Sequence, residues 1–217
     1  MATNEAETKS MISRIPTFTI AVLALCIASS KVDTLASLFV YDRAAIFRGE
    51  VWRLVTSHFV HFGDMHLIYN VVVFGVIGWI IEHKGHKHFK LLCVLMACSI
   101  SAILLIFKPN MIYFGGLSGI VCGSIAYCSL LCLRESSPWR TIAIFSIIFL
   151  IVKIGLETYN NGSLLPYWGA QDFVSIPLSH IAGSLTAFTA FIALRGLELI
   201  QNKSDSDNAL VLNECQQ

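Results

Sequence analysis

The stretch 114-FGGLSGIVCGSIAYCSLLCL-133 is an apolar run without a charged residue, about as long as one bilayer-spanning helix. Five further runs with little or no charge occur at Ile15–Ser30, Met65–Ile81, Leu91–Phe107, Thr141–Leu156 and Ile176–Leu194. The chain of 217 residues is 55% hydrophobic and only 13% charged, which is too apolar for a soluble domain with a polar surface. We therefore predict an all-α polytopic membrane protein, built as a bundle of six transmembrane helices.

The chain divides into a membrane domain with a polar segment at each end. We predict a cytoplasmic N-terminal segment over residues 1–14, a six-helix domain over 15–195 and a cytoplasmic polar tail over 196–217, largely disordered. The first apolar run also fits a signal peptide, because Lys9 and Arg14 precede it and small residues follow. We favour an uncleaved first helix, and either interpretation leaves the orientation of the other five unchanged.

Lys and Arg residues in the connecting segments predict the orientation, because such residues are retained on the cytoplasmic side. With the N-terminus inside, nine of them fall in inner segments and five in outer segments. Both termini are therefore predicted to be cytoplasmic. The long outer segment 31–64 mixes apolar residues with Arg and is expected to lie partly in the interface. A second outer segment, Glu157–Ser175, is a candidate lid.

Composition argues against several classes of protein. The net charge is +1 and the basic residues are scattered, so we predict no nucleic-acid partner. Six of the seven cysteines lie in apolar runs, where packing is the expected role. His58, His61 and His66 do not form an HExxH motif, and only Asp64 is a carboxylate near ligand spacing. We predict no metal and no cofactor.

Polar residues gather in the first turns of three predicted helices that all begin at the outer face. They are His66 and Asn70, Ser118, and His180. The i, i+4 spacing puts His66 and Asn70 on one helix face. Such groups are costly in hydrocarbon unless they face a cavity or one another, so we expect them to meet at one depth.

The chemistry that these residue types permit is acyl transfer. Ser118 can be a nucleophile if the His180 imidazole removes its proton and later returns it to the leaving amine. Because Ser118 begins a helix, nearby N–H groups are free and the helix dipole favours negative charge. Side-chain donors from His66 and Asn70 would complete an oxyanion hole.

Small residues accompany the candidate nucleophile. Gly116 and Gly119 flank it closely and let a substrate backbone approach. Gly119 and Gly123 form a GxxxG step, and Gly183 begins a similar small face on the last helix. We therefore expect close packing that brings Ser118 to His180.

Each polar residue alone also has a structural interpretation. A serine in a transmembrane helix usually bonds to its own backbone, and an asparagine can tie two helices together. Lys153 and Glu157 lie one helical turn apart and can form an ion pair that is structural or that orients a site. The joint placement of Ser118 and His180 favours a reactive site over these separate roles.

Three motifs together resemble the rhomboid intramembrane serine proteases. They are Trp52-Arg53 with Thr56, His61, His66 and Asn70, then Gly116-Leu117-Ser118-Gly119, and then His180-Ile181-Ala182-Gly183. The resemblance covers Val51 to Leu194. It implies a six-helix bundle with a Ser118 and His180 dyad, no third acid, and an oxyanion hole formed by the Ser118 backbone with His66 and Asn70.

Within that family the chain is most similar to the bacterial rhombosortases, in its minimal size, its Thr56–His61 run and its Lys153 with Glu157. This resemblance implies a bacterial inner membrane and transmembrane proteins with C-terminal Gly-Gly sorting tails as partners. Membrane lipid is the other expected partner, and the predicted topology puts the active site near the outer face. Cys122 stands where many rhomboids have a Tyr that stacks on the histidine, so the base must be oriented from elsewhere. Ala187 stands in place of a second Gly.

Two hypotheses from other classes stay open. One is a catalytically silent rhomboid-like protein that binds transmembrane helices, and the other is a small transporter that uses the polar cluster as a pathway. The intact Ser118 and His180 pair argues against the first.

Overall fold

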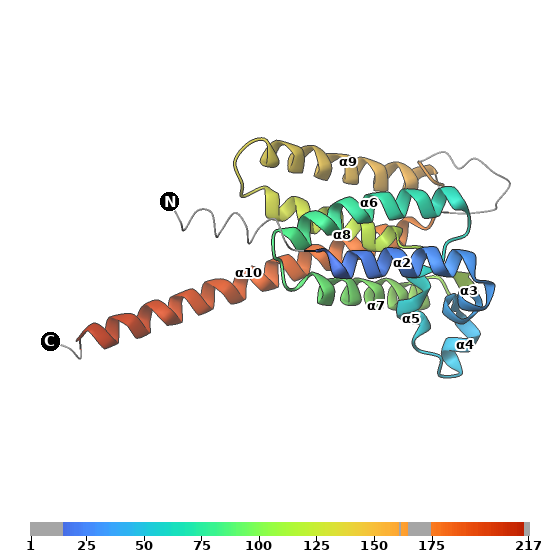
Figure 1. The fold of residues 1–217 in the computed structure, drawn as a ribbon, viewed down its shortest axis with the longest axis horizontal. Coiled ribbons are helices and arrows are strands. Elements are labelled where there is room, and N and C mark those ends of the chain that lie inside the picture. The colour runs from blue at the N-terminus through green and yellow to red at the C-terminus, as the bar shows by residue number, and fades with distance from the viewer. Residues whose placement is uncertain (1–14, 161, 165–174, 215–217) are drawn as a thin grey trace.

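A computed structural model describes residues 15–160, 162–164 and 175–214 of the chain. Six long helices lie side by side in it (Figure 1). They are α2 Thr17–Lys31, α6 Asp64–His83, α7 Phe89–Phe107, α8 Ser118–Cys132, α9 Trp139–Asn160 and α10 Pro177–Glu214. The only strands in the described part are β1 Tyr41–Asp42 and β2 Tyr113–Phe114, which pair antiparallel. The prediction of an all-α bundle is confirmed.

The six helices differ in how they can cross a membrane. Helices α6, α7, α9 and α10 are each long and apolar enough to span it. Helix α2 bends by 113° into α3 (Asp33–Phe39), and the two together qualify as one broken span. Helix α8 has 15 residues and is shorter than a span. The described residues thus give four or five candidate spans, and the sixth predicted helix is the short α8.

Helix α8 is short because it lies inside the bundle. It packs against α6, α7, α9 and α10, and most of its residues are buried. A helix enclosed by other helices does not need to reach from one headgroup region to the other. Its first residue, Ser118, therefore lies within the bundle.

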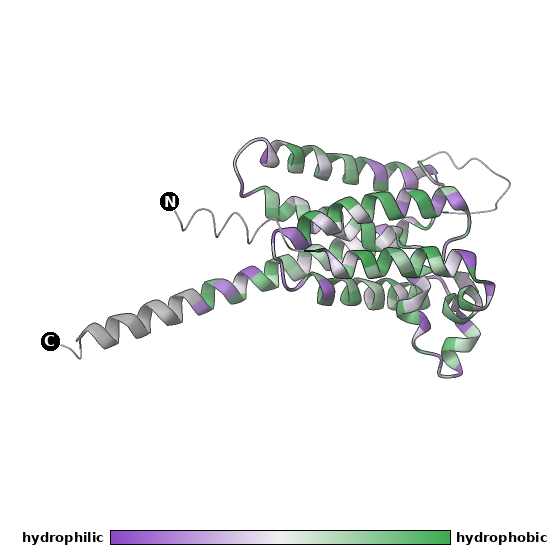
Figure 2. Ribbon diagram, in the orientation of Figure 1, coloured by the Kyte–Doolittle hydropathy of each residue, from purple (hydrophilic) through white to green (hydrophobic). Residues whose placement is uncertain are grey.

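The outward faces of the bundle are apolar. Figure 2 shows hydrophobic residues along the length of the helices and hydrophilic residues mainly near their ends. On helix α9, for example, the exposed apolar residues include Phe145, Ile148, Phe149, Ile151 and Val152. A continuous exposed apolar surface of this kind needs lipid as its solvent. The prediction of a membrane protein is confirmed.

Glycines bring α8 and α10 into backbone contact. A Cβ atom added at Gly119 would lie 2.8 Å from the carbonyl oxygen of Ser179, and one at Gly123 would lie 2.6 Å from that of Gly183. A Cβ atom at Gly183 would meet the carbonyl oxygen of Gly119. The expected small-residue contact is therefore present, and it holds Ser118 close to His180.

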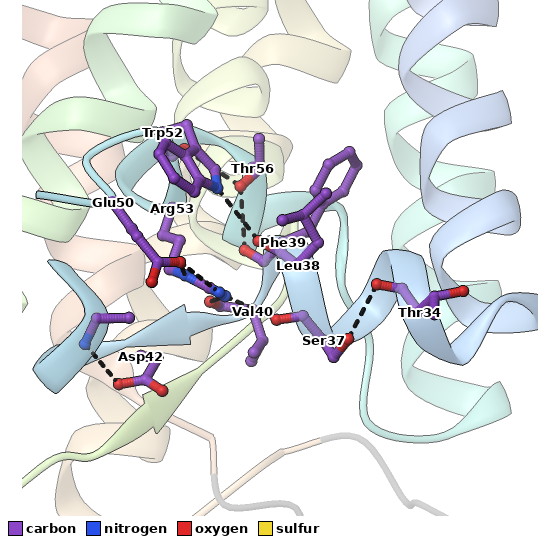
Figure 3. Close-up of polar contacts among 11 residues, drawn as sticks. Thr34, Ser37, Leu38, Phe39, Val40, Asp42, Glu50, Trp52, Arg53 and Thr56 are labelled. Atoms are coloured by element: carbon purple, nitrogen blue, oxygen red, sulfur yellow. Dashed lines mark hydrogen bonds and ion pairs between the residues drawn. The ribbon is translucent and has the colours of Figure 1, made fainter.

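The segment between α2 and α6 forms short elements at one end of the bundle (Figure 1). After α3 and β1 come α4 Arg43–Phe47, α5 Arg53–Thr56 and the 3₁₀ turn η1 Ser57–Phe59. The side chains of Trp52, Arg53 and Thr56 donate hydrogen bonds of 2.7 to 3.3 Å to the carbonyl oxygens of residues 37–40 (Figure 3). Carbonyls at a helix end have no partner within the helix. Trp52 and Arg53 thus hold the end of α3 against α5.

The tail after Gly196 was expected to be largely disordered. That expectation is wrong for residues 197–214, because helix α10 continues to Glu214. Extending a formed helix fixes one residue for each new hydrogen bond and needs no new nucleus, which lets a polar segment follow an apolar one. The candidate lid lies largely outside the described residues, as does the N-terminal segment 1–14.

Candidate active site

Ser118 and His180 lie in contact between α8 and α10. The His180 Nε2 atom is 3.0 Å from the Ser118 Oγ atom. Ser118 is the first residue of α8, and His180 lies in the first turn of α10 and is 3% exposed. A hydroxyl at this distance can donate its proton to an imidazole nitrogen. The hydroxyl and imidazole singled out in the sequence are therefore brought together.

The second ring nitrogen of His180 contacts Glu157 of α9. The Nδ1 atom is 2.8 Å from Glu157 Oε2, and the carboxylate is 2% exposed. The expectation that no acidic residue accompanies the Ser118 and His180 pair is therefore wrong, because the Glu157 carboxylate contacts the imidazole. Glu157 lies 23 residues before His180, and only the packing of α9 beside α8 and α10 brings it to the ring.

Lys153 completes the cluster from one turn earlier on α9. Its Nζ atom is 2.7 Å from Glu157 Oε2 and 3.4 Å from His180 Nδ1. The predicted ion pair is present, with its side chains 13% and 2% exposed. A buried charge pair is tolerable when the two charges compensate each other.

His66 and Asn70 of α6 face the same cavity as the reactive pair. The cavity has a volume of about 320 Å³ and is lined by His66, Asn70, Ser118, His180, Lys153 and Glu157 among others. Asn70 Nδ2 donates to the His66 carbonyl oxygen at 2.9 Å. All four polar residues predicted to meet are thus at one cavity, where α6 supplies side chains opposite the N-terminus of α8.

Gly116 is required by backbone geometry as well as by space. Its φ angle is +134°, which side chains of L residues rarely adopt. A Cβ atom there would lie 2.6 Å from Cε1 of His66. The His66 ring therefore covers the backbone two residues before Ser118.

A second cavity, of about 780 Å³, also reaches Ser118. Its lining is mostly apolar and includes Phe62, Phe107, Met111, Tyr113 and Leu178. This cavity is large enough for several residues of an extended peptide. Ser118 thus lies where a smaller cavity, which the polar cluster lines, meets a larger one.

His58 and His61 hold the loop that leads to Ser118, a role that sequence reasoning missed. His58 is fully buried, and its ring nitrogens lie 3.2 Å from the Gly116 carbonyl oxygen and 3.1 Å from that of Ala97. His61 Nε2 accepts a hydrogen bond from the Leu117 N–H at 3.4 Å. Burial lowers the pKa of His58 and of His61 to about 4. Their apolar neighbours Phe59 and Val60 were the only signal of burial in the sequence.

Comparison with known proteins gives the same family. The family described as "Rhomboid domain" matches residues 48–196, which is more than half of the chain. Rhomboid protease GluP of Bacillus subtilis is 27% identical over 152 residues, 64% of this chain and 30% of that protein. Rhomboid protease GlpG of Klebsiella pneumoniae is 30% identical over 149 residues, 62% of this chain and 52% of that protein. Rhomboid-related protein 1 of Caenorhabditis elegans is 26% identical over 167 residues, 74% of this chain and 44% of that protein. The chain spans about half or less of the length of these relatives.

Proposed function

The chain belongs to the rhomboid family, and from this premise we propose that it is an intramembrane serine protease with Ser118 as nucleophile and His180 as general base. The observation that supports the proposal most directly is the contact of 3.0 Å between His180 Nε2 and Ser118 Oγ inside an apolar bundle. Comparable contacts between a hydroxyl and a base occur at the active sites of soluble serine hydrolases.

The proposed reaction is hydrolysis of a peptide bond in two acyl-transfer steps. Ser118 Oγ attacks the scissile carbonyl carbon while His180 Nε2 takes the hydroxyl proton. The tetrahedral intermediate then loses its amine, to which His180 gives that proton. A water molecule, deprotonated by His180, attacks the acyl group, and Ser118 is regenerated with its proton.

The oxyanion of the intermediate is proposed to bind at the N-terminus of α8. The N–H groups of the first helical turn have no partner within the helix, and the helix dipole favours negative charge there. His66 and Asn70, which line the same cavity, are the proposed side-chain donors. One donor of this kind is typically worth about 2.7 to 4 kcal/mol in the transition state.

The proposed substrates are transmembrane segments of other proteins, and the apolar cavity of about 780 Å³ beside Ser118 supports this class. The finer proposal is a rhombosortase-type enzyme that cleaves C-terminal Gly-Gly sorting tails. It is supported by the resemblance of the Thr56–His61 run and of Lys153 with Glu157. The proposed location is a bacterial inner membrane with both termini cytoplasmic and the site near the outer face, since more Lys and Arg lie in the inner segments.

A fluorophosphonate probe tests the enzyme against the catalytically silent alternative. The purified full chain in detergent is expected to be labelled at Ser118, and labelling is expected to be lost in Ser118→Ala and His180→Ala. Ser129→Ala is the matched control, because it removes a hydroxyl from the same helix about three turns away. An unlabelled wild-type protein that is folded would instead support a helix-binding role.

Co-expression tests the substrate proposal separately. A client protein with a C-terminal Gly-Gly motif, a membrane helix and basic residues is expected to shift in size on a gel only with an intact Ser118. The same client with the two glycines replaced by valine is the control. Equal cleavage of both clients would argue against the sorting-tail proposal and leave the protease proposal standing.

A further inference from the structure

We propose that Glu157 is a positioning residue that fixes the tautomer and the ring orientation of His180, with Lys153 as its counterion. The inference rests on the proposed function, in which His180 is the base. With Glu157 included, Ser118 of α8, His180 of α10 and Glu157 of α9 form a hydrogen-bonded chain in which each helix supplies one member.

The contacts of Nδ1 decide the tautomer of His180. A carboxylate only accepts hydrogen bonds and an ammonium group only donates them. The Nδ1 atom lies 2.8 Å from Glu157 Oε2 but 3.4 Å from Lys153 Nζ. The shorter contact has the length of a charge-assisted hydrogen bond, and the longer one exceeds the usual range. The neutral ring therefore carries its proton on Nδ1 and directs it at Glu157.

The consequence appears at the other side of the ring. With the proton on Nδ1, the Nε2 atom presents a lone pair to Ser118 Oγ at 3.0 Å. That is the state in which an imidazole can accept the hydroxyl proton. The opposite tautomer would place an N–H against the hydroxyl and could not act as a base.

The ring is also held in place at both nitrogens. Cys122, four residues after Ser118, lines the same cavity and has no aromatic ring to stack on an imidazole. The hydrogen bonds to Ser118 and Glu157 come from two different helices and define the plane in which the ring lies. Glu157 thus supplies orientation that a side chain at position 122 does not.

Lys153 keeps Glu157 in the carboxylate form, which accepts the hydrogen bond from Nδ1. It contacts the same oxygen of Glu157 as His180 does, at 2.7 Å. The second carboxylate oxygen, Oε1, accepts from the Leu164 N–H at 3.4 Å. A carboxylate this deeply buried is costly without a cation, and the ion pair makes it compatible with the apolar bundle.

The first test measures labelling of the full chain in detergent by a fluorophosphonate, separated into the inactivation constant and the probe affinity. In Glu157→Gln, the ammonium of Lys153 attracts the amide oxygen, and the amide N–H₂ turns to Nδ1 and favours the wrong tautomer. The inactivation constant is expected to fall by about 10²- to 10⁴-fold with probe affinity unchanged, as when the orienting acid of a soluble triad becomes an amide.

Two further variants make the result specific. Glu157→Asp keeps the carboxylate and is expected to recover at least about tenfold of the loss. Glu82→Gln is the matched control, because Glu82 is a carboxylate that accepts hydrogen bonds from Thr19 and lies outside the site. It is expected to label at the wild-type rate. Wild-type labelling by Glu157→Gln, or equal losses in the Gln and Asp variants, would overturn the inference and leave the protease proposal intact.

The second test does not need activity. Nitrogen-15 NMR of His180 is expected to show a protonated Nδ1 in Ser118→Ala and a protonated Nε2 in Ser118→Ala/Glu157→Gln. An unchanged tautomer would overturn the inference. If the wild-type protein is not labelled, the proposed function fails, while this spectrum still decides whether Glu157 sets the state of the ring.

Discussion

Replacement of Gly119 by alanine is expected to separate the reactive pair. A Cβ atom at Gly119 would lie 2.8 Å from the Ser179 carbonyl oxygen, whereas ordinary contacts begin at 3.4 Å. The helices α8 and α10 must therefore move apart by about 0.6 Å at this point, the difference between these two distances. Gly119 adjoins Ser118 and Ser179 adjoins His180, so the same shift acts on the contact of 3.0 Å between hydroxyl and imidazole.

The shift would lengthen that contact to about 3.6 Å, beyond hydrogen-bonding distance. A misplacement approaching 1 Å at reacting groups can cost about 10²-fold in rate, so we expect fluorophosphonate labelling to slow by about 10- to 10²-fold. Overpacking of this kind also costs about 1 to 3 kcal/mol of stability. Labelling rate and thermal unfolding in detergent measure the two effects.

Gly155→Ala is the matched control for this prediction. Gly155 lies within α9, and a Cβ atom there would meet nothing within 4 Å. Alanine has the higher helix propensity, so labelling should stay at the wild-type rate and stability should be equal or slightly higher. Wild-type labelling by Gly119→Ala, or an equal loss in both variants, would refute the reasoning from backbone contact.

Three further predictions concern the loop before Ser118 and the segment that supports it. Gly116→Ala forces a side chain onto a φ of +134° and against the His66 ring, and should cost about 1 to 3 kcal/mol in thermal unfolding and abolish labelling. His58 and His61 have pKa values of about 4, below the 6.5 of an unfolded histidine, so the unfolded chain binds protons first as pH falls. Stability should therefore be full above pH 6.5 and decline toward pH 4, and His58→Gln should flatten that decline in unfolding measured across this range. Arg53→Lys keeps the charge but loses the guanidinium group, whose Nη1 donates to two carbonyl oxygens while its Nε and Nη2 contact Glu50, and should lower stability by about 1 to 3 kcal/mol. Arg48→Lys, at the exposed C-cap of α4, should not lower stability.

Apolar runs, the placement of Lys and Arg, and small residues on two helices were enough to predict the helices and the meeting of Ser118 with His180. Apolar runs give the helices, and residues in the first turns of helices that start on one side share a depth. The i, i+4 spacing also predicted the ion pair between Lys153 and Glu157. The helices and this ion pair depend on local spacing, whereas the meeting of Ser118 with His180 also needed the predicted orientation and the small-residue contact.

Other features depend on the lateral order and rotation of helices, which local spacing does not encode. The contact between Glu157 and His180 arises only when α9 packs beside α8 and α10 with this face inward. The roles of His58 and His61 were missed because most of their partners are main-chain groups, among them those of residues 97, 116 and 117. The enclosed position of α8 also depends on lateral helix order. It was missed because an apolar run has the same sequence pattern whether lipid or protein surrounds it.

The hydrogen bonds that hold the end of α3 are made to main-chain oxygens of residues 37–40. Every amino acid supplies such an oxygen, proline included. The side chains of the accepting segment can therefore change without loss of these hydrogen bonds. The bonds depend on the identity of the donors Trp52, Arg53 and Thr56. A library that randomises both sets should recover diverse sequences at the acceptors and few at the donors.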